Sequence, residues 1–127
     1  MMDKLLVYRC KHCGNMLIMV NKGGGAMTCC GSPLEAITPN TTDGAVEKHV
    51  PVVENVGGKL KVTVGSVIHP MTEEHYIMWI AVKIKENVYL KYLKPGDEPV
   101  AYFDVPEGES GTAYEYCNLH GLWSYDF

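Results

Sequence analysis

The clearest periodicity in the chain lies in its second half, where polar and apolar residues alternate. Residues 59–64 read Lys-Leu-Lys-Val-Thr-Val, and this period of two predicts a half-buried β-strand. Four further strands are predicted at 76–84, 88–93, 100–105 and 112–117. Turns rich in proline and glycine separate them at 94–97 and 106–111, and no strong amphipathic helix is evident. Short strands with this spacing predict an antiparallel sandwich or barrel.

The first 37 residues have a different character. Leu17, Met19 and Val20 suggest one short strand, but the segment is otherwise rich in cysteine and glycine. A segment below about 40 residues usually needs a metal, disulfides or a partner to fold. Residues 37–45 contain proline, glycine and small polar residues, a composition typical of a linker. We therefore expect two domains, residues 1–37 and 38–127.

Composition narrows the function classes. The chain has 127 residues and a net charge of −4, which disfavours nucleic-acid binding because that requires basic clusters. It contains neither an apolar run of about 20 residues for a membrane span nor a secretory segment. We expect a cytoplasmic protein that neither binds nucleic acid nor enters a membrane. An anionic substrate would need a local positive charge.

Four of the five cysteines form two pairs, Cys10-x-x-Cys13 and the adjacent Cys29-Cys30. In a reducing compartment such cysteines bind a metal more often than they form disulfides. Four thiolates suit tetrahedral zinc or iron. Because Cys29 and Cys30 are adjacent, the backbone between them must twist to aim both sulfurs at one ion. A structural zinc knuckle is the alternative, and His12 is expected to be an exposed neighbour.

Four histidines and the remaining cysteine form a second candidate metal site. They are His49, His69, His75, Cys117 and His120. Each histidine lies near a predicted strand end or in a loop, where binding residues concentrate, and loops 69–75 and 117–120 are expected to converge. Imidazole suits iron, copper, nickel and zinc, and one thiolate adds electron density. Taken singly, each histidine is a structural or solvated residue and Cys117 a small buried apolar one; together they predict a metal site.

These motifs resemble those of desulfoferrodoxin, the two-iron class of superoxide reductase. The resemblance covers nearly the whole chain and rests on the two cysteine pairs and four further segments. These segments are Glu47-Lys48-His49-Val50-Pro51, His69-Pro70-Met71, Glu74-His75-Tyr76-Ile77 and Cys117-Asn118-Leu119-His120-Gly121-Leu122-Trp123. No matched ligand position departs from the family pattern.

The resemblance implies a mainly β fold with two iron ions. A small metal-stabilised, desulforedoxin-like module would be followed by an immunoglobulin-like antiparallel β-sandwich. The module would hold Fe(Cys)4 through Cys10, Cys13, Cys29 and Cys30. The sandwich would hold Fe(His)4(Cys), with axial Cys117 and four equatorial imidazoles from His49, His69, His75 and His120.

The resemblance also implies an activity. A superoxide reductase is a non-haem iron oxidoreductase that reduces superoxide to hydrogen peroxide, a step in oxygen detoxification. Lys48 would guide the anion electrostatically, and Glu47 would be the sixth ligand of the oxidised resting state. Family members form homodimers, and rubredoxin is a usual electron donor. The positive charge of the metal centre would attract the substrate to an otherwise acidic protein.

Three other interpretations remain open from the sequence. In the first, the chain is a non-catalytic two-iron electron-transfer protein. In the second, Cys117-x-x-His120 belongs to a blue-copper site, although such sites commonly add an axial methionine and no methionine follows His120. In the third, the cysteine pairs form a zinc-ribbon adaptor.

Overall fold

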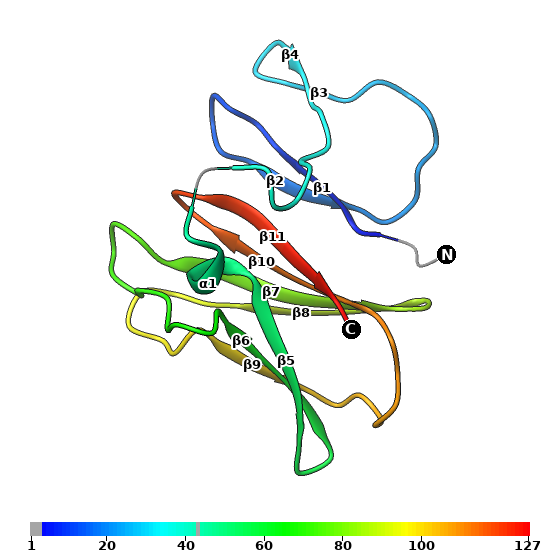
Figure 1. Ribbon diagram of the computed structural model, residues 1–127. Helices are drawn as coiled ribbons and strands as arrows, with labels where there is room; N and C mark the ends of the chain where they lie inside the picture. Colours follow the sequence, from blue (N-terminus) through cyan, green and yellow to red (C-terminus); the bar gives the residue numbers. More distant parts are fainter. Residues whose placement is uncertain (1–3, 43) are drawn as a thin grey trace. The chain divides into compact units, whose positions relative to one another are not determined.

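The fold is almost entirely β. A computed structural model describes residues 4–42 and 44–127, which form two compact units, Lys4–Thr38 and Pro39–Phe127 (Figure 1). Within these described ranges the single α-helix has four residues, and no helix is long and apolar enough to cross a membrane.

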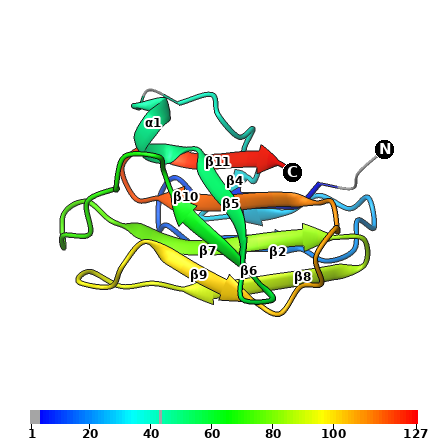
Figure 2. The ribbon, with the colours of Figure 1, turned by 60° about the horizontal axis from the view of Figure 1, so that its bottom comes forward.

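The larger unit is a sandwich of two antiparallel sheets. One sheet has the strand order β11-β10-β7-β8 and the other has the order β5-β6-β9. The elements are α1 (Val46–His49), β5 (Pro51–Val56), β6 (Lys59–Val64), β7 (Ile77–Ile84), β8 (Asn87–Tyr92), β9 (Val100–Phe103), β10 (Thr112–Cys117) and β11 (Gly121–Asp126). A sandwich of four and three antiparallel strands is immunoglobulin-like, so the predicted fold class is confirmed. Figure 2 shows α1, the loop after β6 and the β10–β11 turn at the same end of this unit.

The alternation in β6 reflects which face of the strand is buried. Leu60, Val62 and Val64 are at most 2% exposed, whereas the lysines and threonine between them are not buried. β7 lies between β10 and β8 and is buried along most of its length, which explains its continuous apolar sequence. The inner faces of the two sheets meet in one core, which includes Ile80 and Cys117.

The smaller unit contains two short hairpins. β1 (Leu6–Arg9) pairs with β2 (Met16–Met19), and β3 (Thr28–Cys29) pairs with β4 (Ser32–Pro33). Few apolar side chains are buried here: Leu5, Val7, Tyr8 and Cys10 are the buried ones among its described residues. Two-stranded ribbons with so little core are marginal in water, so the unit depends on something other than apolar burial.

β11 is among the strands that were not predicted from the sequence. The prediction ended at residue 117, but β11 follows β10 after a three-residue turn and forms an edge of the larger sheet. Its neighbouring residues Leu122 and Trp123 are both buried. Two consecutive buried side chains break the alternation by which a half-buried strand is recognised.

Candidate metal centres

The four cysteines of the smaller unit converge. Their sulfur atoms lie within 4.8 Å of one another, and Cys13 Sγ is 3.6 Å from Cys29 Sγ. The first pair is held in a tight turn in which the Gly14 N–H donates to the Cys10 carbonyl at 2.9 Å. The Asn15 side chain donates to Cys29 Sγ at 3.7 Å. The arrangement suits a single ion bound by four thiolates.

The adjacent cysteines meet through an unusual backbone conformation. Cys30 has a φ of +50° and Gly31 a φ of +77°. A residue with a Cβ atom in this left-handed region costs about 1 kcal/mol or more. The twist that adjacent ligands require is therefore present at Cys30. His12 is exposed, with its Nε2 3.4 Å from Ser32 Oγ, and does not belong to the sulfur group.

The thiols of this group differ in acidity. Bonds from the backbone N–H groups of Cys13 and His12 lower the pKa of Cys10 to about 6. Hydrogen bonds with the sulfurs of Cys13 and Cys10 raise the pKa of Cys30 to about 12. Four clustered sulfurs thus cannot all ionise by themselves, and a cation supplies the charge that makes four thiolates compatible. The donor set fits a metal.

The second group contains four imidazoles arranged in a closed square. Neighbouring ring centroids are 4.8 Å apart for His49–His69, 4.6 Å for His69–His75, 5.0 Å for His75–His120 and 4.8 Å for His49–His120. His49 and His75 face each other at 6.4 Å, close to the diagonal of such a square. Cys117 Sγ lies 3.8 Å from His120 Nδ1, and all five donors are within 4.8 Å of one another. The two loops converge as predicted.

Two of these imidazoles have a defined tautomer. His49 Nδ1 is 2.7 Å from the Ala45 carbonyl oxygen, and His69 Nδ1 is 2.7 Å from the Pro70 carbonyl oxygen. A carbonyl only accepts, so each Nδ1 carries the proton, and Nε2 of each neutral ring has a lone pair. The two Nε2 atoms lie 3.2 Å apart. Two lone pairs at this distance repel each other, and a cation between them removes the repulsion.

Burial keeps the rings in the neutral, metal-binding form. Desolvation lowers the pKa of His69 to about 4 and also lowers the pKa of His49 and His75. His75 Nε2 is buried and has no hydrogen-bond partner among the described residues. Buried polar atoms almost always have a hydrogen-bond partner. The unpartnered His75 Nε2 is therefore the clearest single indication of a metal at this site.

Cys117 lies at the end of β10 and is fully buried. Desolvation raises the pKa of its thiol, while bonds from the backbone N–H groups of Leu119 and His120 lower it. Opposite Cys117 the pairing of β10 with β7 is irregular: Tyr116 pairs with Trp79 but Cys117 pairs with Ile77. Such β-bulges re-aim a side chain next to a site. Backbone donors to the sulfur tune its basicity toward a metal.

A glycine allows α1 to bring His49 into the square. Gly65 has a φ of +80°, and a Cβ atom there would lie 2.4 Å from the Glu47 carbonyl oxygen and 2.7 Å from Lys48 Cα. No side chain fits at that distance. The Val67 N–H donates to the same Glu47 carbonyl at 2.9 Å, so the loop leading to His69 is bonded to the helix that carries His49.

Asn118 joins the other two ligand loops. Its side-chain oxygen accepts from the Tyr76 N–H at 2.9 Å, and its side-chain nitrogen donates to the Glu74 carbonyl at 3.0 Å. Glu74 and Tyr76 flank His75, and Asn118 stands between Cys117 and His120. One amide side chain therefore fixes the distance between these two segments. The sequence motif includes Asn118, but its role needed the structure.

Trp123 contacts two of the imidazole residues. Its ring stacks on His49 with centroids 5.1 Å apart and an interplanar angle of 23°. Its indole N–H donates to the His120 carbonyl at 3.0 Å, and the hydroxyl of Thr42 donates to the same carbonyl. Trp123 is only 3% exposed. It therefore positions His49 through its face and His120 through its edge.

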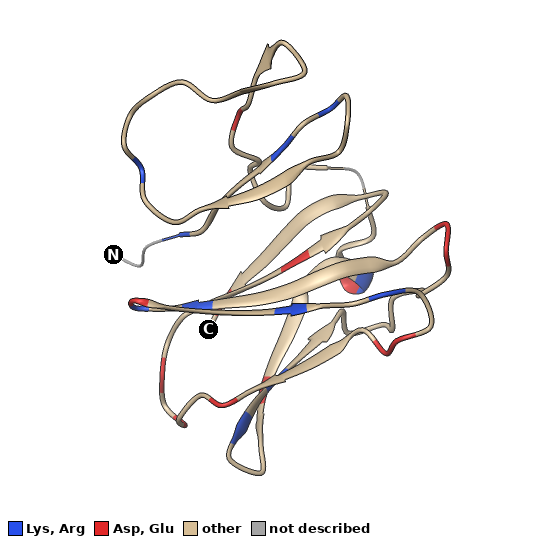
Figure 3. Ribbon diagram, turned by 180° about the vertical axis from the view of Figure 1, so that it is seen from behind, with Lys and Arg blue, Asp and Glu red and all other residues tan. Residues whose placement is uncertain are grey.

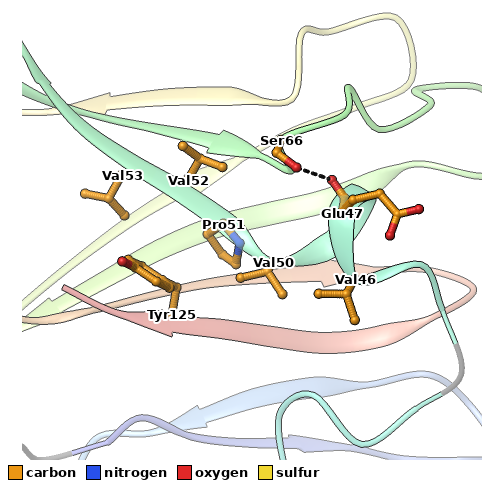
Figure 4. A pocket seen from close by; sticks show the side chains of 8 residues that line it. All are labelled: Val46, Glu47, Val50, Pro51, Val52, Val53, Ser66 and Tyr125. Atoms are coloured by element: carbon orange, nitrogen blue, oxygen red, sulfur yellow. Dashed lines mark hydrogen bonds between the residues drawn. The ribbon is translucent and has the colours of Figure 1, made fainter.

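The two residues predicted to act beside the ligands, Glu47 and Lys48, are exposed on α1. The positive charge of Lys48 contributes to the lowered pKa of His49 and His75, after burial. The Glu47 carboxylate is not among the donors gathered at either centre. Glu47 lies at one end of an apolar groove whose other end is formed by Val53 and Tyr125 (Figure 4).

A buried acid beside the centre was not predicted from the sequence. Glu115 is fully buried in β10, two residues before Cys117, and neither carboxyl oxygen has a hydrogen-bond partner among the described residues. Burial raises the pKa of this carboxyl well above its usual range. A lone glutamate within an otherwise β-typical run, Thr-Ala-Tyr-Glu-Tyr-Cys, was the only signal for it in the sequence.

Comparisons with known proteins agree on one family. A family model described as desulfoferrodoxin matches residues 41–126, and one described as the desulfoferrodoxin N-terminal domain matches residues 2–37. The chain is 50% identical to the desulfoferrodoxin of Nitratidesulfovibrio vulgaris over 92% of each chain. It resembles the crystal structure of the superoxide reductase from Treponema pallidum at 39% identity and a TM-score of 0.77, covering 97% of this chain and 99% of that one.

A shorter structure matches only part of the chain. The one-iron superoxide reductase from Giardia intestinalis is 34% identical with a TM-score of 0.56, and the match covers 64% of this chain and 97% of that one. The two family models together span nearly every residue in the order module then sandwich. The chain belongs to the desulfoferrodoxin family.

Proposed function

We propose that this protein is a superoxide reductase, which catalyses the reaction of superoxide, one electron and two protons to give hydrogen peroxide. The observation that carries the proposal is the square of four imidazoles with the buried sulfur of Cys117 beside it. Relatives from Treponema and Giardia that are named superoxide reductases support it. Its ligands are His49, His69, His75, Cys117 and His120.

Iron held by these five residues would supply the one-electron reductant and a binding position for the anion. Five protein donors are one fewer than an octahedral ion takes, and reactive metal sites differ from structural ones in keeping such a position. The N–H groups of Leu119 and His120 temper the electron donation of the Cys117 sulfur. The ring N–H bonds of His49 and His69 to carbonyls hold both imidazoles in the ligating tautomer.

Lys48 is proposed as the residue that attracts the substrate. It is exposed next to His49, and its positive charge helps to lower the pKa of His49 and His75. In a protein of net charge −4, a cation at the site raises the local concentration of superoxide and orients a proton-donating water. Lys48→Ala is expected to slow substrate binding in pulse radiolysis without lowering iron content, whereas Lys91→Ala leaves the rate unchanged. Equal rates in the wild type and Lys48→Ala would remove this role.

Glu47 is proposed as a sixth ligand in the oxidised resting state, displaced on reduction. Glu47 lies on α1 two residues before His49, and its side chain is exposed. A change in its side-chain conformation would bring the carboxylate to the centre. The visible spectrum of the oxidised Glu47→Ala protein is expected to differ from the wild type, while the spectra of the reduced proteins agree. An oxidised spectrum insensitive to this change would discard the ligand role.

The four-cysteine module is proposed to hold Fe(Cys)4 as an electron-transfer or structural site, because its four thiolates complete a tetrahedral shell. We further propose that residues 1–37 and 38–127 are separate domains. The Giardia structure, which lacks about a third of this chain's length, supports placing the catalytic step in the second domain. A homodimer in the cytoplasm, served by a rubredoxin-like donor, completes the proposal.

Metal analysis combined with visible spectra in both redox states tests the two centres together. Two iron ions per chain are expected, with azide or cyanide binding to the histidine-ligated one. Pulse radiolysis of the reduced protein then measures its reaction with superoxide. A colourless zinc protein, or a second iron closed to azide and unreactive with superoxide, would overturn the proposal.

A further inference from the structure

Two of the four imidazoles come from one loop. His69 and His75 lie between β6 and β7, and their ring centroids are 4.6 Å apart, the shortest side of the square. Part of this loop closes into a turn: the Thr72 N–H donates to the His75 carbonyl at 3.0 Å, and the His75 N–H donates to the Thr72 carbonyl at 3.2 Å. These bonds shape the turn that carries His75, but they do not fix its distance from His69.

Met71 closes the loop with its side chain. The Ile77 N–H donates to Met71 Sδ at 3.3 Å. Ile77 is the first residue of β7 and is fully buried, and a buried N–H without an acceptor is strongly disfavoured. The bond joins a residue two positions after His69 to a residue two positions after His75. One thioether therefore connects the two parts of the chain that carry these ligands.

The β8–β9 loop holds the main chain of Met71. The Gly96 N–H donates to the Met71 carbonyl at 2.9 Å. Within that loop the Asp97 carboxylate accepts the Lys94 N–H at 3.0 Å, and Gly96 has a φ of +92°. The sequence predicted a turn at 94–97 but gave it no role. Its Gly96 N–H now fixes the backbone from which the Met71 side chain reaches Ile77.

Charge does not bring these two loops together. Residues 65–76 include two acidic side chains and no lysine or arginine, and residues 93–99 include two acidic side chains and one lysine. Figure 3 shows the acidic stretches of both loops at the same end of the sandwich. Like charges on neighbouring loops repel each other. The contact between the loops therefore relies on the hydrogen bond from Gly96 to Met71.

A thioether suits this position better than a polar acceptor. Met71 is half-buried and packs against the core of the sandwich, which includes Ile77 and Cys117. Methionine sulfur is a weak acceptor on an apolar, adaptable side chain. Met71 can thus satisfy the Ile77 N–H and fill core space at once, whereas an amide would bring a second polar group that needs a partner of its own.

We propose that Met71 is a positioning residue of the histidine centre, and that its thioether sets the separation of His69 and His75. The inference deepens the proposed function and rests on it, since both histidines are ligands of the iron in that proposal. Without the sulfur acceptor the end of the loop is released, and the His75 ring leaves its place in the square. Outer partners of metal ligands contribute about 10-fold to 100-fold in metal affinity.

Met71→Leu in the iron-loaded full chain tests this role, because leucine keeps the apolar volume and removes the acceptor. We expect faster hydrogen exchange of the Ile77 amide, a shifted visible band of the histidine-ligated iron, and at least about tenfold faster loss of that iron to a chelator. Retained protection of Thr112–Cys117 shows that the sandwich has folded. Met78→Leu makes the same exchange at a half-buried position of β7 and should leave all three values unchanged.

Met71→Gln separates the acceptor from the packing. Its side-chain oxygen can accept the Ile77 N–H, so iron retention should recover part of the way from the leucine variant. Equal iron retention in the wild type and Met71→Leu, or a glutamine variant no better than leucine, would overturn the positioning role. None of these measurements uses superoxide. Fast iron loss in Met71→Leu supports the role even if pulse radiolysis detects no superoxide reduction, a result that would overturn the proposed function instead.

Discussion

The two metal centres of this chain are built in opposite ways. The sulfur site takes its ligands from two short turns within 21 residues, in a unit with few buried apolar residues. The histidine–cysteine site takes its ligands from segments spread over 72 residues, held by two packed sheets. In the first, metal binding is expected to stabilise the fold. In the second, the packed sheets hold the ligands in place for the metal. Because of this difference, metal removal and amino-acid substitutions are expected to affect the two units differently.

Removal of both metals should have the largest effect, and it should destabilise the smaller unit much more than the sandwich. A structural site of four thiolates contributes about 10 kcal/mol to folding, and β1 and β2 have little else to stabilise them. We expect chelation to abolish amide hydrogen-exchange protection in Leu6–Arg9 and Met16–Met19. The central strands Ile77–Ile84 and Thr112–Cys117 should stay protected, because their core is apolar. Loss of protection in all four strands at once would show that the sandwich also depends on metal.

Single ligand substitutions should break one centre and spare the other. Cys13→Ser is expected to remove the sulfur-site iron, while the pre-reduced protein still reacts with superoxide in a single turnover. Cys117→Ser should do the reverse: it keeps the sulfur-site spectrum and lowers the rate of reaction with superoxide by at least about 100-fold, on the scale of losing an activating ligand or its supporting shell. The iron content and the rate of reaction with superoxide are measured for each variant, the rate by pulse radiolysis. A loss of superoxide reduction in Cys13→Ser, with the second iron present, would contradict the division of roles.

The sequence predicted the ligands better than the means of positioning them. Cysteine and histidine are the metal-binding residue types, so their motifs identified the donors without any fold. Gly65 gave no such signal, because its importance lies in the backbone of α1 that passes 2.4 Å from its missing Cβ atom. Asn118 and Trp123 were visible in a motif, but their partners come from other loops. Close approaches between distant segments need the topology, which alternation alone does not specify.

Gly65→Ala tests how far the sandwich determines the second centre. The substitution adds a Cβ atom against the backbone of Glu47 and Lys48 and places alanine at a positive φ. We expect a loss of about 3 kcal/mol in the free energy of unfolding and a lower iron occupancy of the histidine site only. Urea unfolding and metal analysis measure both effects. Gly57→Ala is the matched control, since Gly57 also has a positive φ but open space around it; an equal effect there would assign the cost to φ alone.

Trp123→Phe should have the smallest effect and the most specific one. Phenylalanine retains a ring to stack on His49 but loses the N–H that donates to the His120 carbonyl, which keeps its bond from Thr42. One lost hydrogen bond corresponds to about 1 kcal/mol, seen as weaker metal retention against a chelator and a shifted visible band of the second centre. Trp123→Leu removes the stacking as well and should shift the band further. If Trp123→Phe matches the wild type, the indole N–H does not position His120, and the sheet alone holds that ligand as rigidly as it holds Cys117; if the two variants behave alike, the stacking on His49 contributes nothing.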